Sequence, residues 1–361
     1  MKNATVHRKF WRNKKVLVTG HTGFKGSWLC LWLAQMGARV TGVALPPPTR
    51  PSLFRAARVE DMLERSIMLD IRNRAGFARA LRKIKPQIVI HMAAQPLVRD
   101  SYAQPVMTYE TNIIGTINLL EAIRATAGVR VVLNVTTDKC YDNLERSKGY
   151  SEGDPLGGYD PYSSSKACSE IVTAAYRSSF FNPKKYNKHG VAIATVRAGN
   201  VIGGGDWSKD RLVPDCIRAF VTAKDIILRN PDAVRPWQHV LEPLSGYLIL
   251  SERLFKDGKR FSSAWNFGPD NIDVWTVKRV ANTICHEWGG TAHIRISHGS
   301  YPHETGLLML DIAKAKKALG WKPRWNNLIA LERTVNWYKA YYNRKDVRSL
   351  CLAQIAEYSN S

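Results

Sequence analysis

The stretch that decides the fold is residues 16–28, with the sequence VLVTGHTGFKGSW. An apolar run ends in three glycines spaced G-x-x-G-x-x-G, namely Gly20, Gly23 and Gly26. Glycine lets a ligand approach the backbone closely, and the first N–H groups of a following helix are free to bind a pyrophosphate. The spacing differs from G-x-G-x-x-G, and a Walker loop needs glycine where Lys25 stands. Because the turn directly follows an N-terminal strand, it predicts dinucleotide binding.

Outward from this turn, the first half of the chain alternates between two patterns. Short apolar runs, which predict strands, occupy residues 16–19, 40–43, 88–90, 131–133 and 192–196. Helical spacing of apolar residues covers residues 28–36, 77–84, 113–123 and 167–176. Continuous apolar strands separated by helices are typical of a parallel sheet that is covered on both faces. We therefore predict an α/β fold with a doubly wound, Rossmann-type parallel sheet.

The pattern changes near residue 200, where three consecutive glycines (203–205) are followed by tryptophans, prolines and short helical stretches. We predict a dinucleotide-binding domain over residues 1–200. Residues 201–361 are expected to form mainly a smaller, substrate-binding domain, with one or two later strands returning to the main sheet. Residues 332–344 predict an amphipathic helix.

The composition favours a soluble, cytoplasmic protein. The 361 residues include 53 Lys+Arg and 30 Asp+Glu, a formal net charge of +23. Such a charge attracts nucleic acid, membrane surfaces or phosphorylated metabolites, although a basic solvated surface without a partner is equally consistent. The charges are scattered rather than clustered, which argues against nucleic acid. No apolar run approaches the roughly 20 residues of a membrane span, and no signal peptide is visible.

The six cysteines are widely spread and form no C-x-x-C pair. This usage favours reduced thiols over a disulfide framework, and no His/Cys spacing fits a zinc site. We therefore expect no metal.

A candidate general base is Tyr162, which lies four residues before Lys166 in a stretch predicted to be helical. Residues at i and i+4 share a helix face, and a nearby ammonium lowers the pKa of a phenol from about 10. Such a tyrosine can deprotonate a sugar or alcohol hydroxyl. Tyr341 and Lys345 repeat the spacing. Tyr162 is preferred because it follows a strand end that carries polar residues.

Those polar residues are Thr136, Thr137, Asp138 and Lys139, at the carboxyl edge of the predicted sheet, where ligands bind in this architecture. The adjacent opposite charges of Asp138 and Lys139 are either a surface ion pair or a proton-transfer pair. The proximity of Tyr162 favours proton transfer. The strand at 40–43 runs into ALPPP (44–48) without an acid to bind a ribose, and Arg50 is nearby, so NADP stays open beside NAD.

Together these residues resemble the extended short-chain dehydrogenase/reductase family over nearly the whole chain. The resemblance rests on the glycine turn, DI (70–71), HMAAQ (91–95), NIIGT (112–116) and the Tyr162/Lys166 pair. Within that family the chain is most similar to 4,6-dehydratases of CDP-glucose. The strings TDKCYDN (137–143), GYDPY (158–162), RAGNVIGGGDW (197–207) and RPWQHV (235–240) carry this closer similarity.

The resemblance implies that CDP-glucose is converted to CDP-4-keto-6-deoxyglucose and water by a bound NAD that is regenerated. Tyr162, with Lys166 and Thr137, would take the proton of the C4 hydroxyl. Asp138 would act as acid at the C6 hydroxyl and Lys139 as base at C5. Both would start in the wrong protonation state at pH 7, and the reverse roles would need smaller pKa shifts. Many sister dehydratases carry Glu at the position of Lys139, which favours the CDP-sugar branch.

The resemblance also implies the remaining site residues. The cofactor would contact Gly20, Gly23, Phe24, Lys25, Gly26, Asp70, Ile71, Ala93, Ala94, Gln95, Thr136, Tyr162 and Lys166. The substrate would contact Asn200, Arg211 and Arg235. A homodimer or homotetramer serving deoxysugar synthesis, for an O-antigen, lipopolysaccharide or capsule, is implied as well.

Three alternatives remain at this point. One is a dehydratase of another nucleotide sugar. The second is a 4-epimerase, which would not need the Asp138–Lys139 step. The third is a non-catalytic dinucleotide sensor that binds nucleic acid through its basic surface.

Overall fold

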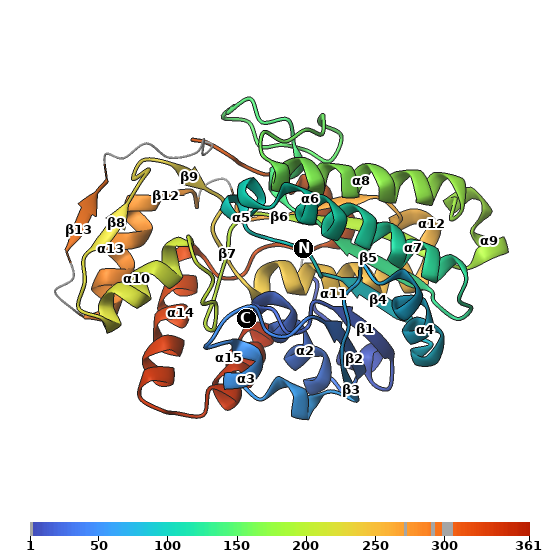
Figure 1. Cartoon of the computed structure of the whole chain (residues 1–361), viewed down its shortest axis with the longest axis horizontal. Coiled ribbons are helices and arrows are strands. Elements are labelled where there is room, and N and C mark those ends of the chain that lie inside the picture. The colour runs from blue at the N-terminus through green and yellow to red at the C-terminus, as the bar shows by residue number, and fades with distance from the viewer. Residues whose placement is uncertain (1–2, 271–272, 290–292, 298–305) are drawn as a thin grey trace.

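The computed structural model describes residues 3–270, 273–289, 293–297 and 306–361. Its centre is a seven-stranded sheet of order β11-β6-β5-β4-β1-β2-β3, in which all neighbours are parallel (Figure 1). The strands are β1 (Lys15–Thr19), β2 (Arg39–Ala44), β3 (Arg65–Met68), β4 (Ile88–His91), β5 (Val131–Val135), β6 (Ala192–Ala198) and β11 (Ala264–Phe267). The prediction of a doubly wound parallel sheet is confirmed.

Helices cover both faces of the sheet, and each face has its own apolar core. On one face lie α4 (Arg74–Ile84), α7 (Gly115–Arg124) and α8 (Pro161–Ser179), which pack on alternate strand residues such as Leu17 and Val89. On the other face lie α2 (Phe24–Gln35) and α11 (Leu241–Lys256), against residues such as Val16 and Ile90, and α15 (Val347–Asn360) packs against α2. Because successive strand residues point to opposite faces, continuous apolar runs were needed to fill both cores.

Most of the chain after residue 200 lies to one side of the sheet (Figure 1). It contains α10 (Leu212–Val221), α13 (Val277–Trp288) and α14 (Asn327–Tyr342), with the strand pairs β7 (Val201–Ile202)/β10 (Gln238–His239), β9 (Val234–Arg235)/β12 (Trp275–Thr276) and β8 (Ile226–Leu228)/β13 (Ile294–Ile296). The strand β11 and the helix α11 return to the main sheet, and α15 returns to pack against α2.

Shorter elements connect these units. They are α1 (Arg8–Trp11), α3 (Leu53–Ala56), η1 (Val59–Met62), α5 (Val98–Ala103), α6 (Pro105–Tyr109), η2 (Glu110–Ile114), η3 (Asp138–Cys140), η4 (Pro183–Lys185), α9 (Tyr186–His189), α12 (Gly258–Phe261) and η5 (Ala315–Leu319). None of the helices in the described ranges is long and apolar enough to cross a membrane.

The start of α8 is fixed by its own sequence. Asp160 caps the helix by accepting a hydrogen bond from the backbone N–H of Ser163 at 2.9 Å, and Pro161 occupies the first turn. An Asp cap satisfies a free N–H group, and proline at this position loses no helical hydrogen bond. This cap places Tyr162 in the first turn and Lys166 one turn later.

Candidate active site

A cavity of about 1390 Å³ opens at the carboxyl ends of β1, β4, β5 and β6. Every site residue predicted from the sequence lines it: Gly20, Gly23, Phe24, Lys25, Gly26, Asp70, Ile71, Ala93, Ala94, Gln95, Thr136, Thr137, Asp138, Lys139, Tyr162, Lys166, Asn200, Arg211 and Arg235. The repeat of the Tyr–Lys spacing does not, because Tyr341 and Lys345 are absent from the lining and α14 ends before Lys345. Residues as far apart in sequence as Gly20 and Arg235 thus share one site.

The glycine turn has the shape needed for a dinucleotide pyrophosphate. Gly20 has a φ of +77°, and a Cβ there would lie 2.8 Å from the nitrogen of Ala93. A Cβ on Gly26 would lie 2.2 Å from the carbonyl oxygen of Gly20, so neither position tolerates a side chain. No side chain caps α2 at Gly23, which leaves its first N–H groups available at the cavity. These residues therefore fit a bound dinucleotide.

Two further segments shape the cofactor side of the cavity. The hydroxyl of Thr19 accepts hydrogen bonds from the N–H groups of Met92 and Ala93, both at 3.1 Å, which holds the chain after β4 against the glycine turn. Asp70, after β3, accepts a hydrogen bond from the Arg72 guanidinium at 2.7 Å, which lowers the pKa of the Asp70 carboxyl. Arg50 also lines the cavity.

Tyr162 and Lys166 lie on the cavity side of α8, but the ammonium does not act on the phenol as the sequence predicted. Burial raises the pKa of Tyr162 to about 12, against the lowering effects of a hydrogen bond from Thr137 and of the Arg211 charge. The ammonium of Lys166 donates to the carbonyl oxygen of Val135 at 3.1 Å, and burial lowers its pKa to about 8. Desolvation therefore outweighs the attraction that was expected from Lys166.

Asp138 and Lys139 lie in the turn η3 rather than in an extended strand. In this turn the two residues are close enough for the Lys139 charge to act on Asp138, where it lowers the pKa of the carboxyl. Burial outweighs this effect and raises that pKa. The Asp138 Oδ1 atom accepts a hydrogen bond from Thr137 at 3.1 Å, whereas Oδ2 is buried without a hydrogen-bond partner among the described residues. A raised pKa, together with an oxygen that has no hydrogen-bond partner among the described residues, suits a carboxylic acid that donates a proton to a ligand.

Cationic side chains line the cavity from both halves of the chain: Lys25, Lys166, Arg211 and Arg235. Burial, with the charges of Arg211 and Lys166, lowers the pKa of Lys25 to about 7. Arg211 also pairs with Asp206 at 3.3 Å. The sequence placed Lys25 in the glycine turn but gave no sign that its side chain would meet these cations.

Sequence reasoning also missed an ion-pair cluster on the cavity wall. Arg99 in α5 and Arg229 after β8 each contact the carboxylate of Asp210 at 3.0 Å. All three residues line the cavity. No local pattern could have found this cluster, because its members are far apart in the sequence. In the described part of the chain, no three His, Cys, Asp or Glu side chains are grouped closely enough to hold a metal ion.

Comparison with known proteins gives concordant matches. The family model described as GDP-mannose 4,6 dehydratase matches residues 17–332. The chain is 50% identical to the CDP-glucose 4,6-dehydratase of Salmonella typhimurium (strain LT2), over 99% of each protein. It is 26% identical to the dTDP-glucose 4,6-dehydratase of Xanthomonas campestris pv. campestris (strain ATCC 33913), over 89% of this chain and 92% of that protein.

Among solved structures, the chain is similar to DesIV, a dTDP-glucose 4,6-dehydratase from Streptomyces venezuelae with NAD and TYD bound. The TM-score is 0.78 at 25% identity, and the match covers 92% of this chain and 98% of that chain.

Proposed function

Because the chain belongs to the GDP-mannose 4,6 dehydratase family, we propose that it is an NAD-dependent CDP-glucose 4,6-dehydratase. The reaction converts CDP-D-glucose to CDP-4-keto-6-deoxy-D-glucose and water. The 50% identity to a CDP-glucose 4,6-dehydratase over 99% of both chains supports this substrate. One observation supports a dehydration most directly. Asp138 lines the same cavity as Tyr162, and its Oδ2 atom is buried without a hydrogen-bond partner among the described residues.

The glycine turn and the start of α2 would hold the pyrophosphate of NAD, with residues 70–71 and 93–95 along the rest of the cofactor. When bound, NAD supplies a hydride acceptor for C4 of the sugar and a hydride donor for C6. Tyr162 and Lys166 line the cavity at the carboxyl edge of the sheet, the edge at which a nicotinamide would bind.

Tyr162 takes the proton of the C4 hydroxyl while the C4 hydride leaves, which produces a ketone at C4. When the phenolate forms, the Thr137 hydroxyl turns its one proton from Asp138 Oδ1 to the phenolate oxygen and so stabilises it. The charge of Arg211 also favours the phenolate, whereas Lys166, whose ammonium donates to the Val135 carbonyl at 3.1 Å, would contact the cofactor.

The ketone acidifies the C5 proton, which Lys139 removes, while Asp138 gives a proton to the C6 hydroxyl and water leaves. Hydride then adds to C6, and Lys139 returns its proton to C5. Over the cycle Tyr162 gains one proton and Asp138 loses one. The Thr137 hydroxyl restores both groups, because it can pass its own proton to Asp138 Oδ1, 3.1 Å away, as it accepts the proton of the Tyr162 phenol.

Asn200, Arg211 and Arg235 bind the sugar diphosphate in this proposal. Guanidinium groups match the geometry of phosphate oxygens, and Arg211 and Arg235 line the cavity on the side formed by the second half of the chain. The division into a cofactor domain (1–200) and a mainly substrate-binding domain (201–361) belongs to the same proposal.

We also propose a cytoplasmic homodimer or homotetramer. All six cysteines are free thiols, which is usual in a reducing compartment. The exposed apolar side chains Val106, Ile114 and Ile171 lie on α6, η2 and α8, three elements that pack together, and they support a contact between copies. Sedimentation velocity would measure the oligomeric state.

The function is tested by incubating the protein with NAD and, separately, CDP-, dTDP-, UDP- and GDP-glucose, followed by mass spectrometry. We expect the loss of one water from CDP-glucose alone. Loss of water from the thymidine compound instead would overturn the substrate, and epimerisation without water loss would overturn the reaction type.

Tyr162→Phe removes the proposed base and leaves the ring in place. We expect the turnover of CDP-glucose to fall about 10²- to 10⁴-fold, the usual contribution of general base catalysis. Thermal unfolding should show that the variant remains folded. Turnover equal to that of the parent would contradict the mechanism.

A further inference from the structure

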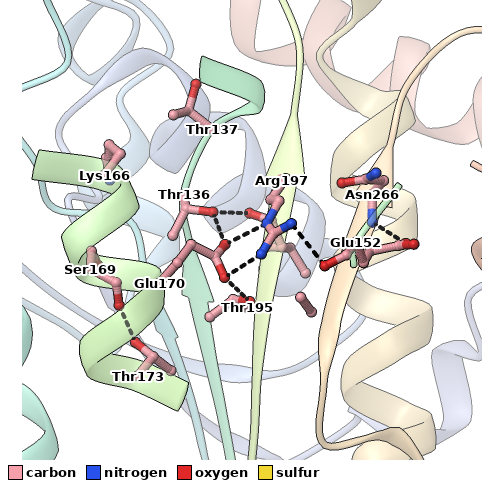
Figure 2. Close-up of polar contacts among 12 residues, drawn as sticks. Thr136, Thr137, Glu152, Lys166, Ser169, Glu170, Thr173, Thr195, Arg197 and Asn266 are labelled. Carbon is pink, nitrogen blue, oxygen red and sulfur yellow. Dashed lines mark hydrogen bonds and ion pairs between the residues drawn. The ribbon is translucent and has the colours of Figure 1, made fainter. Parts of the chain in front are cut away.

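A buried ion pair that the mechanism does not use lies directly behind the catalytic residues. Glu170 and Arg197 each have only 3% of the side chain exposed. Arg197 donates two hydrogen bonds to the Glu170 carboxylate, from Nε to Oε1 and from Nη2 to Oε2, both at 3.0 Å. Neither residue lines the cavity. Figure 2 shows the two side chains facing one another between α8 and β6.

The carboxylate of Glu170 reaches the chain on the N-terminal side of the catalytic turn. Thr136 donates to Oε1 at 2.5 Å, and Thr195 donates to Oε2 at 2.6 Å (Figure 2). Glu170 lies one helical turn after Lys166 on α8. The carboxylate therefore joins the helix that carries Tyr162 and Lys166 to the residue that directly precedes Thr137.

The guanidinium of Arg197 reaches the C-terminal side of the same turn. Its Nη1 atom donates to the phenol oxygen of Tyr141 at 2.8 Å, and the Tyr141 hydroxyl donates to Oδ1 of Asn266 at 2.8 Å. The ring of Tyr141 stacks on that of Tyr150 with centroids 5.1 Å apart. Thr136 and Tyr141 flank residues 137–140, so one ion pair is connected to both ends of the segment that carries Asp138 and Lys139.

A pair of this kind is poorly explained by stability alone. Removing two charges from water is costly, and apolar replacements of buried ion pairs are often neutral or stabilising. A bidentate carboxylate–guanidinium contact does, however, fix the relative position of the elements that carry it. Here those elements are α8, the helix of the oxidation step, and β6, and the hydrogen bonds of the pair to Thr136 and Tyr141 connect both to the turn of the elimination step.

We propose that the Glu170–Arg197 pair is a positioning device that holds the elimination residues Asp138 and Lys139 in register with Tyr162 and Lys166. The inference rests on the proposed dehydratase function. In this arrangement a sugar that has been oxidised at C4 already lies in contact with the acid and the base for water loss, so it need not shift between the two steps. Loosening the device slows elimination more than oxidation, so that the 4-keto sugar with its C6 hydroxyl accumulates.

The test uses Tyr141→Phe, which removes a single hydroxyl and leaves the Arg197 Nη1 group its hydrogen bond to the Glu152 carbonyl at 3.4 Å. Single-turnover reactions with CDP-glucose and NAD are quenched with sodium borodeuteride and analysed by mass spectrometry. The quench converts CDP-4-ketoglucose to a deuterated hexose and the product to a deuterated 6-deoxyhexose. We expect overall turnover to fall about tenfold, within the range produced by small misplacements of catalytic groups, and the trapped hexose fraction to rise several-fold.

Tyr358→Phe is the matched control. Tyr358, on α15, is a buried tyrosine whose hydroxyl donates at 2.6 Å to the buried carboxyl group of Glu242 on α11. It should lower the melting temperature without raising the trapped hexose fraction. If Tyr141→Phe behaves like Tyr358→Phe, the positioning role is wrong.

The double variant Glu170→Leu/Arg197→Met removes both charges together and keeps an apolar core. The proposal expects a folded protein that accumulates the 4-keto intermediate. A folded double variant with the parent's trapped fraction would show that the pair only stabilises the fold. Absence of any product from the parent enzyme would instead refute the proposed function, which separates the two failures.

Discussion

Asp138 is the residue on which the chemistry depends most directly, because its Oδ2 atom is buried without a partner among the described residues. Burial raises the pKa of this carboxyl, which favours the protonated acid. Asn has the same shape but cannot donate a proton to a leaving hydroxyl. We expect Asp138→Asn to reduce product formation about 10²- to 10⁴-fold while C4 oxidation continues. Borodeuteride trapping would reveal CDP-4-ketoglucose; product formation at the parent's rate would contradict the assigned role.

Lys25 gives a pH-dependent contribution to stability. Burial, with the charges of Arg211 and Lys166, lowers its pKa to about 7, whereas an unfolded chain has the ordinary value of 10.5. Between these values the unfolded chain binds more protons, so the contribution of Lys25 to the free energy of unfolding rises with pH. Lys25→Met lacks this term. From pH 7 to 9 the parent should gain about 2 kcal/mol relative to Lys25→Met, measured by urea unfolding without ligands. A constant difference would show that Lys25 stays charged.

At the scale of elements, the C-terminal helix α15 is anchored through one buried carboxylate. Glu242 in α11 accepts hydrogen bonds from the Tyr358 hydroxyl at 2.6 Å and from the backbone N–H of Trp325 at 2.7 Å. We expect Tyr358→Phe to lower the free energy of unfolding by about 1–3 kcal/mol, because the Glu242 carboxyl group loses a hydrogen bond in the core. Chemical denaturation gives this value, and kcat should be unchanged because α15 does not line the cavity. A large loss of kcat would indicate that α15 influences the site.

At the scale of the whole molecule, the net charge of +23 acts on an anionic substrate before it binds. A positive field raises the association rate of anions, and salt screens it with a Debye length of about 10 Å at 0.1 M. We expect kcat/KM for CDP-glucose to fall several-fold between low and 0.3 M NaCl, with kcat nearly constant. Steady-state kinetics at several salt concentrations measure this. If kcat/KM is independent of salt, the charge has no role in substrate capture.

Local patterns were sufficient for the five strands β1, β2, β4, β5 and β6, the glycine turn and the helix that carries Tyr162 and Lys166, but not for β11. Each of these predictions depends on residues that are close in the sequence. The features used were the spacing of Gly20, Gly23 and Gly26, the alternation of apolar runs with helical patterns, and the i, i+4 relation on α8. They failed at β3 (Arg65–Met68), whose ends are exposed, because an edge strand with half-buried residues lacks a continuous apolar run. They also gave no signal for α15.

The amino-acid sequence by itself therefore determined which groups carry the chemistry. It contains their residue types directly, and near neighbours in the sequence set the local backbone conformation. Folding determined the charge states and the partners of those groups. Burial raised the pKa of Tyr162, whereas the neighbouring Lys166 was expected to lower it. Folding also placed Lys25 where the charge of Arg211 lowers its pKa. The same folding joined Glu170 to Arg197, which are 27 positions apart, behind the catalytic turn. Desolvation and ion pairing depend on distances through space, and spacing along the chain does not encode those distances.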